Sequence, residues 1–348
     1  MSYRKALVGL AAGEYHVVHD LEIPQPKPDE MLCRVAAVAL NHVDAKIIDY
    51  SPVPGIGGYD FAGEVIQIGT GVTRFKLGDR VLGLTFGLNP DNLSAGSFSE
   101  FALATEDLSC RIPPSMSYEQ AATLPNTVGT AGLALYIKLG LPMPNSIKSD
   151  SGFVLVSGGA TATGQVAVQL LKLSGLKPVA TCSPGNNDML RSLGAVETFD
   201  YHSPTCGRQI RNYTGNSLSY ALDCITTTET MSMCYEAIGR EGGKYTALEP
   251  PSAHVKYTRR DVHVDWVLVM TLLGNPIMLD GHYGRPPIPI HRRFAREFFE
   301  SVEGFLEQDL LRSPLFQVRA GGLEGVKEGI NELRTNQAQG GKLVYTLA

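Results

Sequence analysis

Between residues 153 and 248, short apolar runs alternate with segments whose apolar residues recur at helical spacing. Each run is short enough for a strand that is buried on both faces. The predicted strands are residues 153–156, 177–181, 196–199, 220–223 and 244–248. The predicted helices are residues 166–171, 188–193, 207–213 and 228–238. Strands that alternate with helices in this way predict an α/β fold with a doubly wound parallel sheet, the Rossmann arrangement.

The loop after the first of these strands is a candidate for binding the phosphates of a dinucleotide. Read as G-x-G-x-x-G from Gly159, it keeps Gly164 as the third glycine but has Thr161 at the second position. A helix that begins after such a turn offers N–H groups and a positive dipole end to a pyrophosphate. The hydroxyls of Thr161 and Thr163 are further candidates for phosphate contacts. An ordinary tight turn is the alternative interpretation.

The two ends of the chain follow other patterns. Residues 32–40, 63–68, 80–84 and 98–104 are strand-like and are separated by turns rich in Gly and Pro, which predicts a mainly antiparallel, barrel-like β domain. Residues 118–141 are predicted to form a helical connector.

After residue 248 the regular alternation stops. The proline-rich residues 281–289 suit neither a central strand nor a helix. Amphipathic helices are predicted at residues 292–311 and 323–333, and a closing strand at 341–345. Since a strand needs a sheet to join, we expect the closing strand to return to the first domain. The expected barrel-like catalytic domain is residues 1–120 and 275–348, and the expected Rossmann domain is residues 121–274.

Composition narrows the possible partners and compartment. The chain has 348 residues, 43% of them hydrophobic, and a net charge of −5, with no arginine-rich run that would favour a nucleic acid. Apolar runs such as residues 266–270 are too short to span a membrane. The N-terminal residues do not resemble a signal peptide. The six cysteines are widely spaced, which favours free thiols and a cytoplasmic protein, and no C-x₂-C pair suggests a zinc lobe.

Motifs along nearly the whole chain point to one family. They are NHVDAK at residues 41–46, GYDFAGEV at 58–65, GTGVTRFKLGDRV at 69–81, AATLP at 121–125, the loop at 159–164 and GGKLV at 340–344. Together they resemble the medium-chain dehydrogenase/reductase superfamily, which implies a GroES-like catalytic domain beside the Rossmann domain. Zinc enzymes of the superfamily have a cysteine where Asn41 stands and Gly-His-Glu where residues 58–60 read Gly-Tyr-Asp. The resemblance is therefore to the zinc-free branch, and no metal is expected.

Shorter stretches resemble a narrower group within the superfamily. They are TCSP at residues 181–184, YALDCIT at 220–226, AIGR at 237–240, YGRP at 283–286 and GLP at 140–142. These resemble the trans-acting enoyl reductases that serve fungal polyketide synthases, of the lovastatin-pathway type. The resemblance implies reduction of an α,β-unsaturated thioester, with hydride passing from the nicotinamide to Cβ and a proton to Cα.

The expected cofactor is NADPH. A site that selects NAD usually has an acidic residue at the end of the second strand, on the ribose 2′-hydroxyl. Residues 182–186 lack a carboxylate there, and Ser183 and Asn186 can donate to a 2′-phosphate. Plain turn chemistry is the alternative role of both residues. No Lys or Arg lies beside them in the sequence to balance the phosphate charge.

The resemblance also implies the residues of the site. The cofactor-binding candidates are Asn41, His42, Val43, Asp44, Ala45, Gly159, Ala160, Thr161, Ala162, Thr163, Gly164, Ser183, Pro184, Gly185, Asn186, Tyr201, Leu248, Glu249 and Lys342. The substrate-binding candidates are Val128, Gly129, Thr130, Ala131, Gly132, Leu133, Ala134, Leu135, Val269, Met270, Thr271, Leu272 and Leu273. A buried edge of the core is the alternative for residues 269–273, and a structural histidine is the alternative for His42.

Two residues are the catalytic candidates. Lys46 is expected to act as electrophile or proton donor, because without zinc the enolate must be held by hydrogen-bond donors. Its alternative is a solvated surface lysine. Thr127 is expected at a helix start, where its hydroxyl would contact the substrate carbonyl or the nicotinamide amide. Its alternative is a helix N-cap.

A trans-acting reductase implies a partner, the acyl carrier protein of a polyketide synthase. Carrier proteins are acidic, so the pairs Arg259-Arg260 and Arg292-Arg293 are candidate contacts, and solvated charges are the alternative. Prolines at 286, 287 and 289 would spoil pairing through an edge strand, which favours a monomer. Two other functions remain open: an NADPH quinone or alkenal reductase with free substrates, and a non-catalytic NADPH-binding protein.

Overall fold

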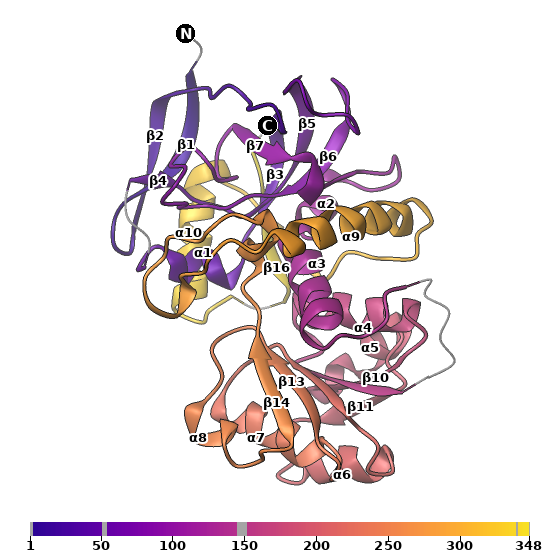
Figure 1. The fold of residues 1–348 in the computed structure, drawn as a ribbon. Helices are drawn as coiled ribbons and strands as arrows, with labels where there is room; N and C mark the ends of the chain where they lie inside the picture. The colour runs from indigo at the N-terminus through magenta and orange to yellow at the C-terminus, as the bar shows by residue number, and fades with distance from the viewer. Residues whose placement is uncertain (1–2, 51–53, 145–151, 339, 348) are drawn as a thin grey trace. The chain divides into compact units, whose positions relative to one another are not determined.

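The structure is a computed structural model that describes residues 3–50, 54–144, 152–338 and 340–347 (Figure 1). It divides into two compact units. Met1–Gly129 and Met270–Ala348 form the first, called the split unit below, and Thr130–Val269 forms the second, the continuous unit. The boundaries fall at residues 129/130 and 269/270, whereas the sequence pattern placed them at 120/121 and 274/275.

The continuous unit contains a six-stranded sheet whose neighbouring strands are all parallel. The strands are β9 (Phe153–Ser157), β10 (Lys177–Cys182), β11 (Glu197–Asp200), β12 (Tyr220–Asp223), β13 (Gly243–Ala247) and β14 (Val262–Trp266). Their spatial order, β11-β10-β9-β12-β13-β14, is the Rossmann order, in which the winding reverses between the first and fourth strands. The predicted doubly wound sheet is confirmed, and β14 is a strand that was not predicted.

Helices connect these strands and bury their apolar faces. They are α4 (Ala162–Leu173), α5 (Asn187–Leu193), α6 (Cys206–Tyr213), α7 (Thr228–Ala237) and α8 (Ala253–Lys256). In α4, Val166, Leu170 and Leu171 are fully buried, as their helical spacing predicts. Met231, Cys234 and Tyr235 of α7 join strand residues in one hydrophobic core.

The split unit is built from two sheets. The larger has the order β15-β16-β3-β5-β6-β8, with β7 also paired to β3, and the smaller has the order β2-β1-β4. The strands are β1 (Tyr3–Ala11), β2 (Glu14–Glu22), β3 (Glu30–Ala39), β4 (Gly55–Ile56), β5 (Asp60–Ile68), β6 (Arg80–Leu84), β7 (Phe101–Thr105), β8 (Ser109–Arg111), β15 (Phe316–Arg319) and β16 (Lys342–Thr346). All pairs are antiparallel except β15 with β16. Since β16 pairs with β3, the predicted return of the last strand to the first domain is confirmed.

Helices of the split unit differ from the predictions at their ends. They are α1 (His42–Ile47), α2 (Tyr118–Ala122), α9 (Pro289–Glu307) and α10 (Gly322–Arg334), while α3 (Pro125–Gly132) runs across the unit boundary into a π-helix, η2 (Leu133–Lys138). The helical connector predicted at 118–141 is present as α2, α3 and η2, with a break between α2 and α3, which begins at Pro125. Proline is favoured in the first turn of a helix, and α9 likewise begins at Pro289, which lies inside the segment that the sequence pattern predicted to exclude a helix.

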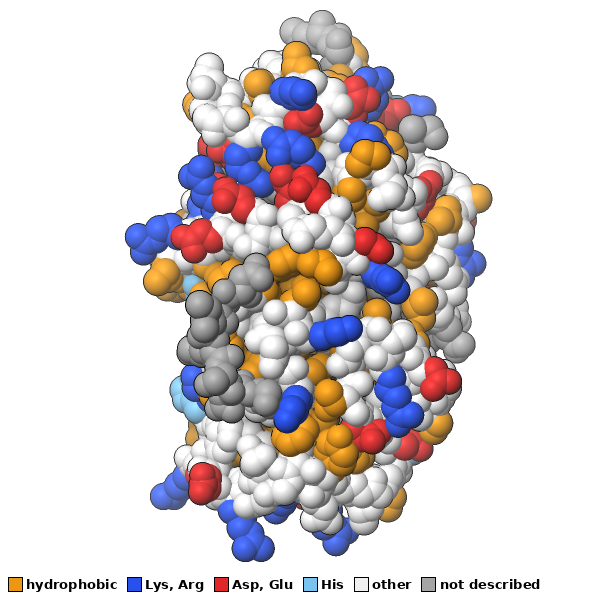
Figure 2. Space-filling model, turned by 90° about the vertical axis from the view of Figure 1, so that its right-hand side faces the viewer, with side chains coloured by type: hydrophobic (Ala, Val, Ile, Leu, Met, Phe, Trp, Pro, Cys, Tyr) orange, Lys and Arg blue, Asp and Glu red, His pale blue; other side chains and the backbone are white. Residues whose placement is uncertain are grey.

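Other expectations concern the surface and the thiols. Searched over the described ranges, the chain has no helix long and apolar enough to cross a membrane. On the face drawn in Figure 2, Lys and Arg side chains lie scattered among acidic and apolar ones. All six cysteines are free thiols, as predicted.

Candidate functional site

The carboxyl ends of the parallel strands form a candidate site in the continuous unit. The winding reverses between β9 and β12, where Ser157 pairs in register with Asp223. Ligands of doubly wound sheets bind at such a reversal, outside the carboxyl ends of the strands. The predicted phosphate loop, residues 158–164, leaves β9 at this point.

Glycines at both ends of the loop are required by its geometry. Gly158 has φ +73°, and a Cβ there would lie 2.7 Å from the Ile225 side chain. A Cβ on Gly164 would lie 2.4 Å from the Gly158 carbonyl oxygen, so only glycine lets α4 start this close to the turn. Side chains at Ala160 and Ala162 do not extend beyond Cβ, and residues 160–163 at the start of α4 are half-buried. The loop therefore fits a dinucleotide pyrophosphate.

Thr161 has a different use from the expected one. It is the N-cap of α4: its hydroxyl accepts the Gly164 N–H at 3.0 Å and donates to the Gly158 carbonyl at 2.8 Å. The hydroxyl proton is committed to the turn, so Thr161 stabilises the helix start and cannot donate to a phosphate without breaking the cap. Thr163 lies in the first turn of α4 and is half-buried.

The segment after β10 forms a 3₁₀ turn, η3 (Pro184–Asn186), in which the Asn186 amide donates to the Ser183 hydroxyl at 3.3 Å. The sequence pattern missed a carboxylate nearby, because Asp200, at the end of β11, pairs in register with Cys182. A ring nitrogen of His202 lies 2.7 Å from Asp200, and the His202 N–H also binds that carboxylate at 3.0 Å. These two bonds, the backbone one first, lower the pKa of Asp200. Tyr201 is half-exposed and stacks on His202.

Leu248 and Glu249 follow β13, and a strained turn holds Leu248 in place. Thr226 has φ +61°, a conformation that a β-branched residue rarely adopts, and its hydroxyl accepts the Leu248 N–H at 3.2 Å. The turn is fixed by the buried Asp223, which accepts the N–H groups of Ile225 and Thr226. Sequence reasoning missed Asp223 and Thr226; their only signal was an acidic residue at a strand end followed by a polar turn.

A separate candidate site is a buried polar network in the split unit. Lys342 Nζ lies 2.5 Å from Asp60 Oδ2 and donates to Asn41 Oδ1 at 2.9 Å. The Asn41 amide donates to Asp60 at 2.9 Å, and Asn126 donates to both Asn41 and Asp60. An ammonium group therefore bonds Asn41 and Asp60, two of the three positions at which the zinc dehydrogenases differ from this chain. Searched over residues 3–50, 54–144, 152–338 and 340–347, no group of three or more His, Cys, Asp or Glu could hold a metal ion.

Thr127 belongs to the same network. Its hydroxyl donates to the Thr123 carbonyl at 2.9 Å and accepts from Lys342 Nζ at 3.4 Å. Because a hydroxyl has one proton, Thr127 in this state can offer a third partner only a lone pair. It lies within α3 and bonds the carbonyl four residues earlier, so the N-cap alternative is wrong. Sequence reasoning did not identify Asp60 and Asn126 as members of the site.

Helix α1 carries four of the predicted cofactor residues and the catalytic candidate Lys46, and a fifth cofactor candidate, Asn41, is its N-cap. The Asn41 N–H donates to Asp44 Oδ2 at 2.7 Å, which fixes the helix start. Asp44 is fully buried, and burial raises the pKa of its carboxyl to about 8. Ala45 is buried and Val43 half-buried, whereas His42 and Lys46 are exposed. Helix α1 thus joins the buried network through Asn41 and presents Lys46 at its exposed last turn.

The predicted substrate segments are mostly buried. Residues 128–135, in α3 and η2, are all buried. Residues 269–273 form a 3₁₀ helix, η4 (Val269–Leu273), in which only Leu273 is half-buried. The Thr271 hydroxyl lies 2.8 Å from His291 Nδ1, which connects η4 to α9. This burial agrees with the alternative of a core edge as much as with an acyl-chain wall.

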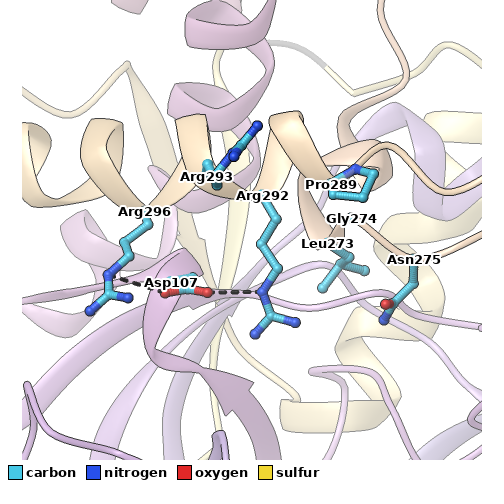
Figure 3. A pocket seen from close by; sticks show the side chains of 8 residues that line it. All are labelled: Asp107, Leu273, Gly274, Asn275, Pro289, Arg292, Arg293 and Arg296. Atoms are coloured by element: carbon cyan, nitrogen blue, oxygen red, sulfur yellow. Dashed lines mark hydrogen bonds and ion pairs between the residues drawn. The ribbon is translucent and has the colours of Figure 1, made fainter.

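The two arginine pairs proposed to contact a carrier protein belong to different units, Arg259-Arg260 to the continuous unit and Arg292-Arg293 to the split unit. Arg259 donates to the Tyr235, Ile238 and Gly239 carbonyls at the end of α7, so its charge stabilises that helix end. Arg292 and Arg293 instead line a cavity of about 360 Å³ in the split unit (Figure 3).

Comparisons with known proteins agree with this geometry. Residues 27–114 match the family described as alcohol dehydrogenase GroES-like domain, and residues 162–248 match the family described as zinc-binding dehydrogenase. A trans-enoyl reductase of Gibberella fujikuroi is 49% identical over 99% of both chains. One from a Penicillium species is 48% identical over 99% of this chain and 98% of its own.

Solved structures show the same fold. An alcohol dehydrogenase superfamily protein of Novosphingobium aromaticivorans has a TM-score of 0.80 at 23% identity, covering 99% of this chain and 100% of its own. The CurK enoyl reductase has a TM-score of 0.77 at 19% identity, covering 99% of both chains.

Proposed function

The chain belongs to the fungal trans-enoyl reductases of the medium-chain dehydrogenase/reductase superfamily, and from this premise we propose that it reduces an α,β-unsaturated thioester held by the acyl carrier protein of a polyketide synthase, with NADPH as the cofactor. It is an oxidoreductase whose fold binds a nicotinamide cofactor. The observation that carries the proposal is the full-length identity to trans-enoyl reductases, together with a phosphate loop that fits a dinucleotide.

NADPH is proposed over NADH from the polar groups after β10. Ser183 and Asn186 supply donors for a 2′-phosphate, and no carboxylate lies within residues 182–186. Asp200 would repel a phosphate, but its Oδ1 already accepts the His202 N–H and lies 2.7 Å from the His202 Nδ1. Ser183→Asp should lower the affinity for NADPH relative to NADH, because it places the carboxylate typical of NAD sites beside the ribose. Equal affinities for both cofactors in the wild type would contradict the choice.

The chemistry assigns separate roles to Lys46 and Thr127. When bound, the cofactor supplies the hydride that Cβ receives. Negative charge then builds on the thioester oxygen, and a proton must reach Cα. We assign the donor role to Lys46, which is exposed at the last turn of α1. The Thr127 hydroxyl donates its proton to a hydrogen bond with the Thr123 carbonyl, so it can only accept from a further partner. The partner that we propose is therefore a donor, the NH₂ group of the nicotinamide carboxamide.

NADPH oxidation with a short α,β-unsaturated acyl thioester tests the function. Turnover that requires NADPH and falls by about 10²-fold or more in Lys46→Ala would support both the reaction and the donor. Turnover of a simple quinone without thioester reduction would favour the free-substrate reductase. Cofactor binding without turnover of any activated alkene, including a carrier-bound one, would favour a binding protein.

A further inference from the structure

A cavity lies at the start of α9, and the proposed cofactor and catalytic residues do not line it. Its charged lining residues are three arginines of α9 (Arg292, Arg293 and Arg296) and one aspartate, Asp107, from the 3₁₀ turn η1 (Glu106–Leu108). Figure 3 shows Asp107 between Arg292 and Arg296, with Arg293 directed away from that carboxylate. The lining itself has three positive charges and one negative charge, and two further carboxylates, Asp29 and Glu300, pair with Arg292 and Arg296.

Two of the arginines are already paired with carboxylates. Arg292 Nε donates to Asp107 at 2.8 Å, and its second nitrogen donates to Asp29 at 2.8 Å. Arg296 lies 3.8 Å from Asp107 and 3.6 Å from Glu300. Arg293 is exposed and makes no ion pair with any residue that the structure describes. Its charge is therefore the one that a ligand would neutralise without breaking an existing pair.

The opposite side of the cavity is formed by the end of a predicted substrate segment. Leu273, the last residue of η4, lines it together with Gly274 and Pro289. The Gly274 carbonyl accepts the Ile288 N–H at 3.2 Å, and Thr271 contacts His291 at 2.8 Å. These contacts connect η4 to the first turn of α9. The cavity therefore has apolar groups from Leu273 and Pro289 and guanidinium groups from the arginines of α9.

We propose that this cavity binds the phosphodiester of the phosphopantetheine arm that carries the thioester. The inference rests on the proposed function, because it assumes a carrier-bound substrate. Guanidinium groups match the oxygens of a phosphate in charge and geometry. The arm has two methyl groups next to its phosphate, and Leu273 and Pro289 offer them apolar contacts. The arm would then continue along η4, the segment assigned to the acyl chain.

Three substrates with one acyl group test this site: the pantetheine thioester, the phosphopantetheine thioester and the carrier-bound thioester. Arg293→Ala should raise KM about tenfold for the two substrates with a phosphate, the usual effect of losing one charge-assisted hydrogen bond. It should leave kcat and KM unchanged for the pantetheine thioester, which also shows that the variant is folded. Arg293→Lys should recover part of the loss. Arg260→Ala removes an exposed arginine of the continuous unit and should change none of these values.

Each other outcome is distinct. An equal KM change for all three substrates would overturn the phosphate site while the enoyl reductase function stands. A rise for the carrier-bound substrate alone would mean that Arg293 meets carboxylates of the carrier protein, and would also overturn it. A rise for carrier-bound substrate in Arg260→Ala but not in Arg293→Ala would move docking to the continuous unit. If the wild type reduces none of the thioesters, the function itself fails, and this inference with it.

Discussion

Lys342 and Asp60 form a buried ion pair, with the ammonium 2.5 Å from the carboxylate, although they are 282 residues apart in the chain. Asp60 is fully buried at the start of β5, and Lys342 is almost fully buried at the start of β16. Because β3 lies between these strands, the pair joins the two neighbours of the central strand. It also holds Asn41 from both ends of its amide.

Substituting one partner of this pair should be far more damaging than substituting both. Lys342→Met leaves a buried carboxylate unpaired, and Asp60→Asn leaves a buried ammonium unpaired, so each should lower the free energy of unfolding by about 3–5 kcal/mol. The double variant should lose much less than the sum of the two. Urea unfolding of all four proteins measures this coupling. Additive losses would show that the two charges do not stabilise each other.

Thr127 should matter more for the cofactor than for stability. Thr127→Val removes one of four acceptors around Lys342 Nζ, so we expect a loss of about 1 kcal/mol in unfolding free energy. If its lone pair accepts from the carboxamide, KM for NADPH should rise about tenfold. Thr127→Ser keeps the oxygen and should restore KM. Steady-state kinetics with varied NADPH decides, and an unchanged KM in Thr127→Val would exclude the contact.

Gly164 should tolerate no side chain. Gly164→Ala puts a methyl group against the backbone of residues 158 and 159, which should cost about 1–3 kcal/mol and displace the start of α4. Cofactor affinity, measured by quenching of protein fluorescence, should fall with it. Gly152→Ala is the matched control, since nothing lies within 4 Å of a Cβ there. Similar affinities for the two variants would contradict the close approach of helix and turn.

Asp44 should make the protein less stable as pH rises. Burial raises the pKa of its carboxyl to about 8 in the folded state, above the ordinary value of 3.8. Between these values the folded state binds a proton that the unfolded state has lost. The contribution is therefore complete below about pH 4 and lost as pH rises through 8. Asp44→Asn, which cannot titrate, should show a smaller decrease in unfolding free energy over this range. Parallel slopes for the two proteins would show that Asp44 is ionised throughout.

The parallel sheet could be predicted from sequence because each of its predicted strands and helices shows a pattern within its own few residues. Each buried strand is a short apolar run, and each connecting helix has its own period. Strand β14, with the sequence VHVDW, was missed because it carries charge and forms the edge of the sheet, where burial is one-sided at most. The helical connector at 118–141 was predicted, but its division into α2 and α3 before Pro125 was not.

The polar network could not be predicted in the same way. Its bonds join Lys342 to Asn41 across 301 residues and Asn126 to Asn41 across 85, and no periodic pattern records such pairings. A motif placed Asn41 and Lys342 among the cofactor candidates, but only the structure shows that Lys342 donates directly to Asn41 and that both bond Asp60. For Thr161, the sequence suggested that the hydroxyl contacts a phosphate. Only the structure shows that this hydroxyl accepts the Gly164 N–H and caps α4.

The split arrangement of the chain sets an order for protein synthesis. Every strand of the six-stranded sheet leaves the ribosome before residue 270, so the continuous unit has all its strands while the other is still incomplete. Asp60 and Asn41 emerge early but lack their ammonium partner until β16 has been made. The polar network around α1 can therefore assemble only after β16 has been made. A ribosome that stops a few residues before Lys342 releases a chain in which the Asp60 carboxylate has no ammonium partner.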